Sequence, residues 1–324
     1  MYLAAFSTFD LASQIQSVAV AWQVYSIRHS AFDLGLVGLV LFAPSLLLAP
    51  LTGLTADRVD RRAIMAAAAC AEAAISLALI PLFGAHGAGA LALVLGLLAL
   101  AGIARAFAFP AEQSLLPAVV APERYVHASA TASAIREVVR IGGPALGGIL
   151  IALGAVYAYG AVALAGLAGA VAVVFVPLLT RPARDAPSLR DAFAGLRYIL
   201  ARPVLGGAIS LDLFAVLFGG ATALLPVYAA DVFHAGAAGL GMLRSSVAIG
   251  GGLCALAIAR RPIHRRAGPR VLLAVAGFGA ATIATRWSRS ARRTRCAAAS
   301  PRSKASSSSP ATSWASSSPA RSPR

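Results

Sequence analysis

The chain has 324 residues, of which 59% are hydrophobic and only 12% are charged, and its mean hydropathy is +0.78. These values exclude a soluble domain of this size, and the unbroken apolar blocks do not fit the alternation of a β-barrel, so an all-α integral membrane protein is expected. The formal net charge of +16 is high, but nine of the 28 basic residues follow Thr285, where no acidic residue occurs. We therefore expect the lipid bilayer, and no nucleic acid, as a partner.

Eight segments are apolar and long enough to cross a bilayer, which takes roughly 20 residues. The predicted spans are residues 2–27, 32–56, 63–83, 88–109, 131–153, 156–179, 205–232 and 239–259. A ninth apolar run, residues 271–285, would be only about 22 Å long as a helix, so we expect it to insert incompletely.

The arginines between these segments indicate the orientation. If the N-terminus is cytoplasmic, fourteen arginines fall in inside loops and only Arg28 falls outside. Because cytoplasmic loops carry an excess of basic residues, this count predicts a multi-pass protein of the bacterial plasma (inner) membrane with its N-terminus in the cytoplasm.

Four regions follow from the segments. They are a six-helix transmembrane bundle (1–179), a cytoplasmic linker with an amphipathic helix (180–204), a partial second transmembrane bundle (205–285) and a basic tail (286–324). The tail contains no Leu, Ile, Val, Phe or Met and is expected to be disordered. Two interpretations stay open: an authentic tail that touches anionic lipids, or a shifted reading frame, which the interrupted ninth run favours.

A dense basic pattern joins the second and third spans. It follows G-x-x-x-D-R-x-x-R-R, with the residues Gly53, Asp57, Arg58, Arg61 and Arg62. The arginines suit an anchor at the cytoplasmic face, the glycine permits close helix approach, and the aspartate can face a helix N-terminus or an arginine. The pattern resembles the bend between helices two and three of the major facilitator superfamily, except that Asp60 replaces a common glycine and predicts a less permissive turn. An ordinary basic loop is the alternative.

The fifth span contains the sequence GGPALGG. Its residues Gly143, Pro144, Gly147 and Gly148 match the G-P-x-x-G-G signature of that superfamily's exporters, although Val139 stands where the full signature has glycine. Proline kinks a helix and glycines give a smooth face to a neighbour, so we expect a pivot between conformations. The alternative is a generic packing face of small residues.

Three longer stretches, AWQVYSIRHSAFDLGLVGLV, ARAFAFPAEQSLLPAVV and LDLFAVLFGGATALLPVYA, resemble the enterobactin-exporter-like and macrolide-efflux-like branch of these exporters. The resemblance covers residues 2 to about 285. It implies a fold of two six-helix bundles, of which this chain would supply the first and two to three helices of the second. We therefore expect a C-terminally truncated or frame-shifted exporter with impaired transport, in which Asp57 lacks the partner that the family's eleventh helix provides.

Charged residues at membrane depth are candidates for proton or substrate binding. They are Asp10, Glu72, Arg105 and Asp212. A desolvated carboxylate could bind and release a proton, whereas the structural alternative is a hydrogen bond to a neighbouring helix. Arg105, which we place near the cytoplasmic end of the fourth span, is expected to pair with Asp57 or a membrane carboxylate. A local network of Arg136, Glu137 and Arg140 is also predicted.

No phosphate-binding loop, dinucleotide fingerprint or nucleophile elbow occurs, and the cysteines and histidines show no metal-ligand spacing. We therefore predict that the protein is not an enzyme and has no cofactor. The predicted function is proton-coupled export of lipophilic small molecules, of the drug or siderophore type, by alternating access between two bundles. The alternative is a membrane scaffold that does not transport.

Overall fold

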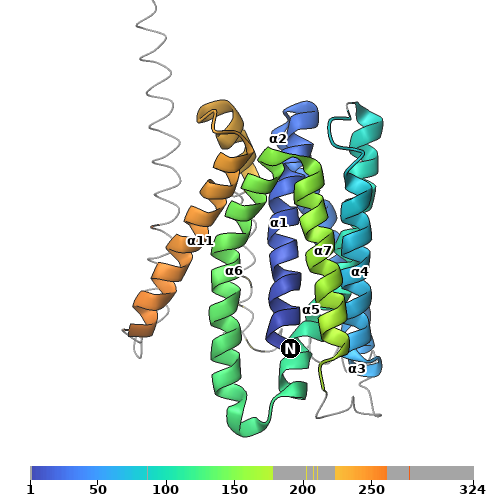
Figure 1. Cartoon of the computed structure of the whole chain (residues 1–324), viewed down its shortest axis with the longest axis vertical. Coiled ribbons are helices and arrows are strands. Elements are labelled where there is room, and N and C mark those ends of the chain that lie inside the picture. The colour runs from blue at the N-terminus through green and yellow to red at the C-terminus, as the bar shows by residue number, and fades with distance from the viewer. Residues whose placement is uncertain are drawn as a thin grey trace, which may run out of the picture. The chain divides into compact units, whose positions relative to one another are not determined.

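The computed structural model describes residues 2–85, 87–177 and 223–260, together with the single residues 202, 207, 210 and 277. Every element in this described part is helical (Figure 1). The chain divides into two compact units, Met1–His264 and Arg265–Arg324, and the architecture below is that of the first. Asp212, the amphipathic helix of the linker, the basic tail and all but one residue of the ninth apolar run lie outside the described residues.

Short turns connect the long helices of the first 177 residues. The helices are α1 Tyr2–Arg28, α2 Ala31–Leu47, α3 Ala49–Arg58, α4 Arg61–Leu79, α5 Ala88–Val119, η1 Pro122–Arg124, α6 Tyr125–Leu153 and α7 Ala155–Val174. A second group follows with α10 Leu225–Val227, the π-helical turn η3 Tyr228–Val232 and α11 Gly236–Arg260. Helix α1 packs against α2, α5, α6, α7 and α11 and is therefore the central helix of the bundle (Figure 1).

The second predicted span, residues 32–56, is wrong as a single helix. The chain forms α2 and α3 instead, with a break at Leu48. Pro50 lies in the first turn of α3 and has no backbone N–H, so it cannot continue the hydrogen-bond ladder of α2. The break thus follows from Pro50, which the predicted span 32–56 had included within one helix.

The fourth predicted span ends too early at Phe109. Helix α5 continues through Pro110 and Pro117 to Val119. Its extra turns bury Ala111 and Leu115 in an apolar cluster with residues of α1, α4 and α7. This burial outweighs the backbone hydrogen bonds that the prolines remove.

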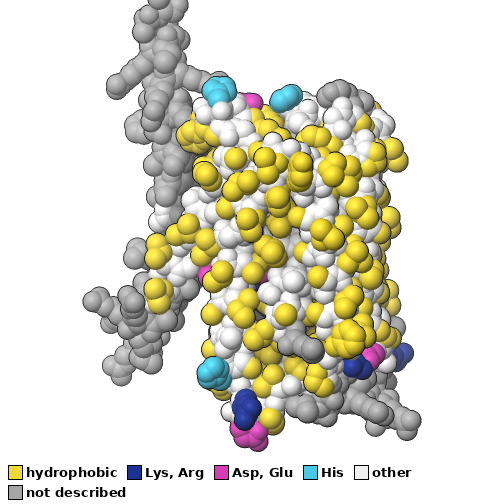
Figure 2. All heavy atoms as spheres, in the orientation of Figure 1, with side chains coloured by type: hydrophobic (Ala, Val, Ile, Leu, Met, Phe, Trp, Pro, Cys, Tyr) yellow, Lys and Arg dark blue, Asp and Glu magenta, His cyan; other side chains and the backbone are white. Residues whose placement is uncertain are grey.

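The outer surface of the bundle is apolar. Figure 2 shows hydrophobic side chains over the length of the helices and charged side chains gathered toward the ends. By length and composition, three of the described helices, α4, α5 and α7, could cross a membrane, and the shorter α2 is also apolar. The expected all-α membrane fold is confirmed, because such a surface requires lipid rather than water around it.

Small residues set the distances between neighbouring helices. A Cβ atom added at Gly166 of α7 would lie 3.1 Å from the carbonyl oxygen of Ala69 in α4, and one added at Gly169 would lie 2.9 Å from the hydroxyl of Thr8 in α1. Helix backbones approach this closely only where side chains are absent. The core therefore consists of tightly packed small residues with a few polar side chains enclosed among them.

Candidate functional site

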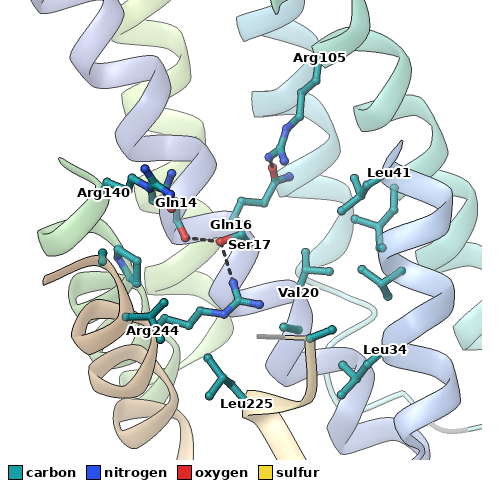
Figure 3. A pocket seen from close by; sticks show the side chains of 18 of the residues that line it. Gln14, Gln16, Ser17, Val20, Leu34, Leu41, Arg105, Arg140, Leu225 and Arg244 are labelled. Carbon is teal, nitrogen blue, oxygen red and sulfur yellow. Dashed lines mark hydrogen bonds between the residues drawn. The ribbon is translucent and has the colours of Figure 1, made fainter. Parts of the chain in front are cut away.

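A cavity of about 430 Å³ lies between the central helix and the second group of helices. Its apolar wall includes Val20, Leu34, Val37, Leu41, Leu98, Leu225 and Val247. Its polar wall includes Gln14, Gln16, Ser17, Arg105, Glu137, Arg140 and Arg244. Figure 3 shows Arg140 and Arg244 on one side of the cavity and Leu34 and Leu41 on the other, with Arg105 on the side of Leu41 and Leu225 next to Arg244. Such a mixed surface suits a small molecule with an apolar body and a polar group.

The guanidinium of Arg105 joins three helices at one edge of this cavity. Its Nη2 donates to Glu72 Oε1 at 2.5 Å and to Gln16 Oε1 at 2.7 Å. Gln16 in turn donates through Nε2 to the hydroxyl of Ser76 at 3.2 Å. The predicted membrane carboxylate next to Arg105 is therefore Glu72. This carboxylate is buried and does not line the cavity.

Arg105 does not lie near the end of its helix. We expected it near the end of a helix, but α5 runs from Ala88 to Val119, so Arg105 lies near its middle. The early end assigned at Phe109 caused the error. The corrected position places the ion pair with Glu72 inside the bundle, where a buried pair is costly to break.

Asp10 lies on α1 with one carboxylate oxygen, Oδ2, buried and without a hydrogen-bond partner among the described residues. The charges of Arg105, Arg136 and Arg140 act on it. Arg136 itself pairs with Glu112 of α5 at 2.9 Å and lies over the ring of Phe6 at 4.7 Å. Asp10 also has a side-chain hydrogen bond with Gln14, and among the described residues it forms no ion pair with the three arginines whose charges act on it.

The predicted network of Arg136, Glu137 and Arg140 is not the arrangement that the structure shows. Arg136 reaches across to Glu112, a residue that sequence reasoning missed. Glu112 had been placed outside the membrane because the fourth span was ended before Pro110. The signal that could have found it is the apolar sequence that resumes at Leu115 and continues to Val119 after the three polar residues that begin with Glu112.

The four residues of the exporter signature lie in α6 between α1 and α11. Added Cβ atoms at Gly143 and Gly147 would lie 2.6 Å from Gln14 Cβ and 3.0 Å from Ile15 Cα of α1. An added Cβ at Gly148 would lie 2.8 Å from Gly241 Cα of α11. The carbonyl of Pro144 is also in contact with Gly241, so α6 and α11 touch backbone to backbone. No sequence signal had selected Gly241.

The basic pattern between α3 and α4 holds helix ends together. Arg61 Nη1 donates to the carbonyl of Ser114 in α5 at 3.3 Å, and Arg62 Nη1 donates to the carbonyl of Val176 after α7 at 3.0 Å. Arg58 is exposed, and the side chain of Asp57 lies outside the described side chains, so its predicted lack of a partner stays a prediction. These contacts agree with a structural anchor.

Two details of this pattern concern Gly53 and Asp60. The close helix approach expected at Gly53 is absent, because no described atom would lie within 4 Å of a Cβ added there. Asp60 caps α4, since its Oδ1 accepts from the backbone N–H of Arg62 at 2.9 Å, and the less permissive turn predicted there stays a prediction. The Arg62 guanidinium, 3.0 Å from Oδ2, and this backbone bond hold the pKa of Asp60 below its ordinary value.

The second group of helices is attached to α1 through three contacts, two near its middle and one near its C-terminal end. Ser17 Oγ accepts from Arg244 Nη1 at 2.9 Å, Val18 packs against Leu240, and the hydroxyl of Tyr25 donates to Asp231 in η3. Toward its C-terminal end α11 leans away from α6 (Figure 1). The two helices are therefore in close contact near the turn between α1 and α2 and diverge toward the end where the chain begins.

Comparison with known proteins bears out the resemblance. Residues 2–297 match the family described as transmembrane secretion effector. Similar proteins include the enterobactin exporter EntS of Shigella dysenteriae serotype 1 (strain Sd197) and those of Escherichia coli O139:H28 (strain E24377A / ETEC) and O9:H4 (strain HS). Each is 28% identical over 269 residues, which are 80% of this chain and 62% of the relative. This chain belongs to the transmembrane secretion effector family of the major facilitator superfamily.

Proposed function

We propose that the protein exports lipophilic small molecules, of the drug or siderophore type, across the bacterial inner membrane by proton-coupled alternating access, with its N-terminus in the cytoplasm. Membership of the family and the relatives described as enterobactin exporters support export. The distribution of arginines between predicted loops supports the orientation.

The observation that carries the proposal is the position of the cavity. Its walls come from α1, α2, α5 and α6 of the first helices and from α11 and the residues around α10 of the second group. Alternating access requires a site that two helix groups share, so that moving one group against the other changes which side can reach the site. A cavity inside either group alone would not serve this mechanism.

The contacts between the groups support one state of such a cycle. The close contact of Gly148 with Gly241 and the hydrogen bond from Tyr25 to Asp231 both lie toward the turn between α1 and α2. With a cytoplasmic N-terminus, that turn faces outward. The diverging end of α11 then faces the cytoplasm, from which an exporter takes its substrate.

Of the three carboxylates Asp10, Glu72 and Glu112, Asp10 is the best suited to couple protons. Its buried Oδ2 has no hydrogen-bond partner among the described residues, whereas Glu72 is paired with Arg105 and Glu112 with Arg136. A carboxylate that is not committed to an ion pair can take up and release a proton without breaking the bundle. Asp212 stays a second candidate.

Transport in inverted membrane vesicles tests this proposal. Because we expect impaired transport, vesicles that contain the full chain should accumulate a fluorescent lipophilic dye only weakly, but above vesicles without the protein, when their lumen is acidic, and a protonophore should release it. Asp10→Asn should abolish gradient-driven accumulation, while Glu123→Gln, at an exposed turn, should leave it unchanged. Accumulation no greater than in vesicles without the protein would refute export, and accumulation that survives the protonophore would refute proton coupling.

A further inference from the structure

The polar wall of the cavity is rich in hydrogen-bond donors. It contains three arginines, Arg105, Arg140 and Arg244, and one carboxylate, Glu137. A guanidinium carries five N–H donors and no acceptor. Only part of this capacity is used within the protein, so the wall offers N–H groups to whatever enters the cavity.

The three arginines differ in how far they are neutralised. Arg105 is paired with Glu72, although its Nε is buried without a hydrogen-bond partner among the described residues. Arg244 donates to the hydroxyl of Ser17, which is a neutral group. In the described part of the chain, neither Arg140 nor Arg244 forms an ion pair. These two cavity-lining cations therefore have no directly bound counter-ion among the residues that the structure describes.

The carboxylates in the neighbourhood do not fill that role. The charge of Arg140 acts on Asp10, but Asp10 does not line the cavity. Glu137 lines it, yet its Oε1 lies next to the backbone of α11, 3.0 Å from where a Cβ of Gly252 would be. A molecule in the cavity therefore meets two cations and one carboxylate beyond the Arg105 pair.

The remaining wall is hydrocarbon. Leu34 and Leu41 of α2 lie across the cavity from Arg140 and Arg244 (Figure 3), and Val37 and Leu98 also line the cavity. A small inorganic anion would leave this surface bare, whereas an organic molecule with an apolar body would cover it. The ligand that matches both walls is amphiphilic.

We infer that this cavity binds an amphiphilic organic anion, such as a carboxylate, phenolate or sulfonate on an apolar body, with Arg140 and Arg244 as its counter-ions. The inference rests on the proposed transport function and names its substrate class. A lipophilic cation of the same size would meet like charges, and a neutral molecule would leave the guanidinium charges without compensation.

The positions of the two arginines link this ligand to the shared site. Arg140 belongs to α6 and Arg244 to α11, the two helices that touch at Gly148 and Gly241. Arg140 and Arg244 lie on the same side of the cavity (Figure 3), so their like charges repel each other, and an anion bound to both replaces repulsion by two attractions. Binding of an anion should therefore favour the approach of the helices that must move during transport.

Two probes of equal body and opposite charge test the inference. Fluorescence anisotropy would measure the binding of pyrene-1-sulfonate and of 1-pyrenemethylammonium to the full chain in a non-ionic detergent. We expect the sulfonate to bind about tenfold or more tightly than the ammonium, because charge-assisted hydrogen bonds distinguish the two. Added salt should reduce this difference.

Substitutions test whether Arg140 and Arg244 cause the preference for the sulfonate. Arg140→Gln and Arg244→Gln should each weaken sulfonate binding about tenfold and leave ammonium binding unchanged or stronger. Arg124→Gln, in the exposed turn η1, is the matched control and should change neither affinity. Arg244→Lys keeps the charge and should weaken sulfonate binding less than Arg244→Gln, which keeps the test decisive should one variant fail to fold.

The outcomes separate this inference from the transport proposal, because binding is measured without a gradient. Equal or tighter binding of the ammonium, or unchanged sulfonate binding in both glutamine variants, would overturn the inference. Preferential transport of the ammonium in vesicles would overturn it while supporting export. Sulfonate preference without any transport would support the inference and refute only the proposed export.

Discussion

The contact between α6 and α11 supports a sharp prediction for the substitution Gly148→Ala. The new methyl group would lie 2.8 Å from the carbonyl oxygen of Ala237 and 2.8 Å from Gly241 Cα, both backbone atoms that cannot rotate aside. Helix α11 must therefore move away from α6. Such overpacking typically costs about 1–3 kcal/mol, which offsets or exceeds the gain of about 1 kcal/mol from replacing glycine by alanine inside a helix.

Gly160 provides a control substitution for Gly148→Ala. Gly160 lies in α7, and no described atom would lie within 4 Å of a Cβ added there. Gly160→Ala should therefore raise the free energy of unfolding by up to about 1 kcal/mol, while Gly148→Ala should lower it or leave it unchanged. Both values would come from unfolding of the purified full chain in the same detergent.

A distance measurement would show whether α11 moves as expected. Spin labels at the exposed positions Ile149 of α6 and Met242 of α11 would report the separation of the two helices. We expect longer distances in Gly148→Ala than in the parent, with no change in Gly160→Ala. Equal stabilisation by both alanines, together with unchanged distances, would mean that the backbone contact with Gly241 is absent from the populated conformation.

Two further predictions concern charged residues. Glu72→Gln leaves the Arg105 guanidinium without its counter-ion inside the bundle, so the free energy of unfolding should fall by about 3 kcal/mol. A double replacement of Glu72 and Arg105 by leucine should cost clearly less, and an equal cost would show that the pair is not buried as described. Asp60→Ala removes the cap of α4 and should cost about 1 kcal/mol at pH 7. Because folding lowers the pKa of Asp60, its contribution is full above the unfolded pKa of about 3.9 and is lost as the pH falls through the lower folded value. The difference between parent and variant should therefore shrink only at acidic pH, and a difference that shrinks near neutrality would contradict this assignment.

The sequence identified most helices because apolar blocks and basic turns are local features. The errors arose at prolines, whose effect depends on what surrounds them. Pro50 ends a helix where the adjoining turn is partly exposed, whereas Pro110 lies inside α5, where burial of the following turn compensates for the missing N–H. Nothing in the local sequence distinguishes these two cases, because the compensation comes from contacts with distant helices.

The same limit applies to the site. Arg105 was recognised as a membrane charge, and its partner Glu72 was recognised separately, but only the packing of α4 against α5 shows that they pair. Arg244 was missed, although it lies within the predicted span 239–259 and is a charged residue at membrane depth, as Arg105 is. Gly241 was missed because a glycine is functional here only through its contact with Gly148.

Helix α1 explains why the cavity and the interhelical contact depend on each other. Five consecutive residues near its middle contact different parts of the bundle: Gln14 and Ile15 meet the glycines of α6, Gln16 meets α4 and α5, and Ser17 and Val18 meet α11. Successive helical residues point about 100° apart, so such a run covers the whole circumference of the helix. Three of these residues, Gln14, Gln16 and Ser17, also line the cavity. A movement of α11 against α6 therefore alters the shape and charge of the cavity through α1, and a ligand between Arg140 and Arg244 acts on the same contacts in return.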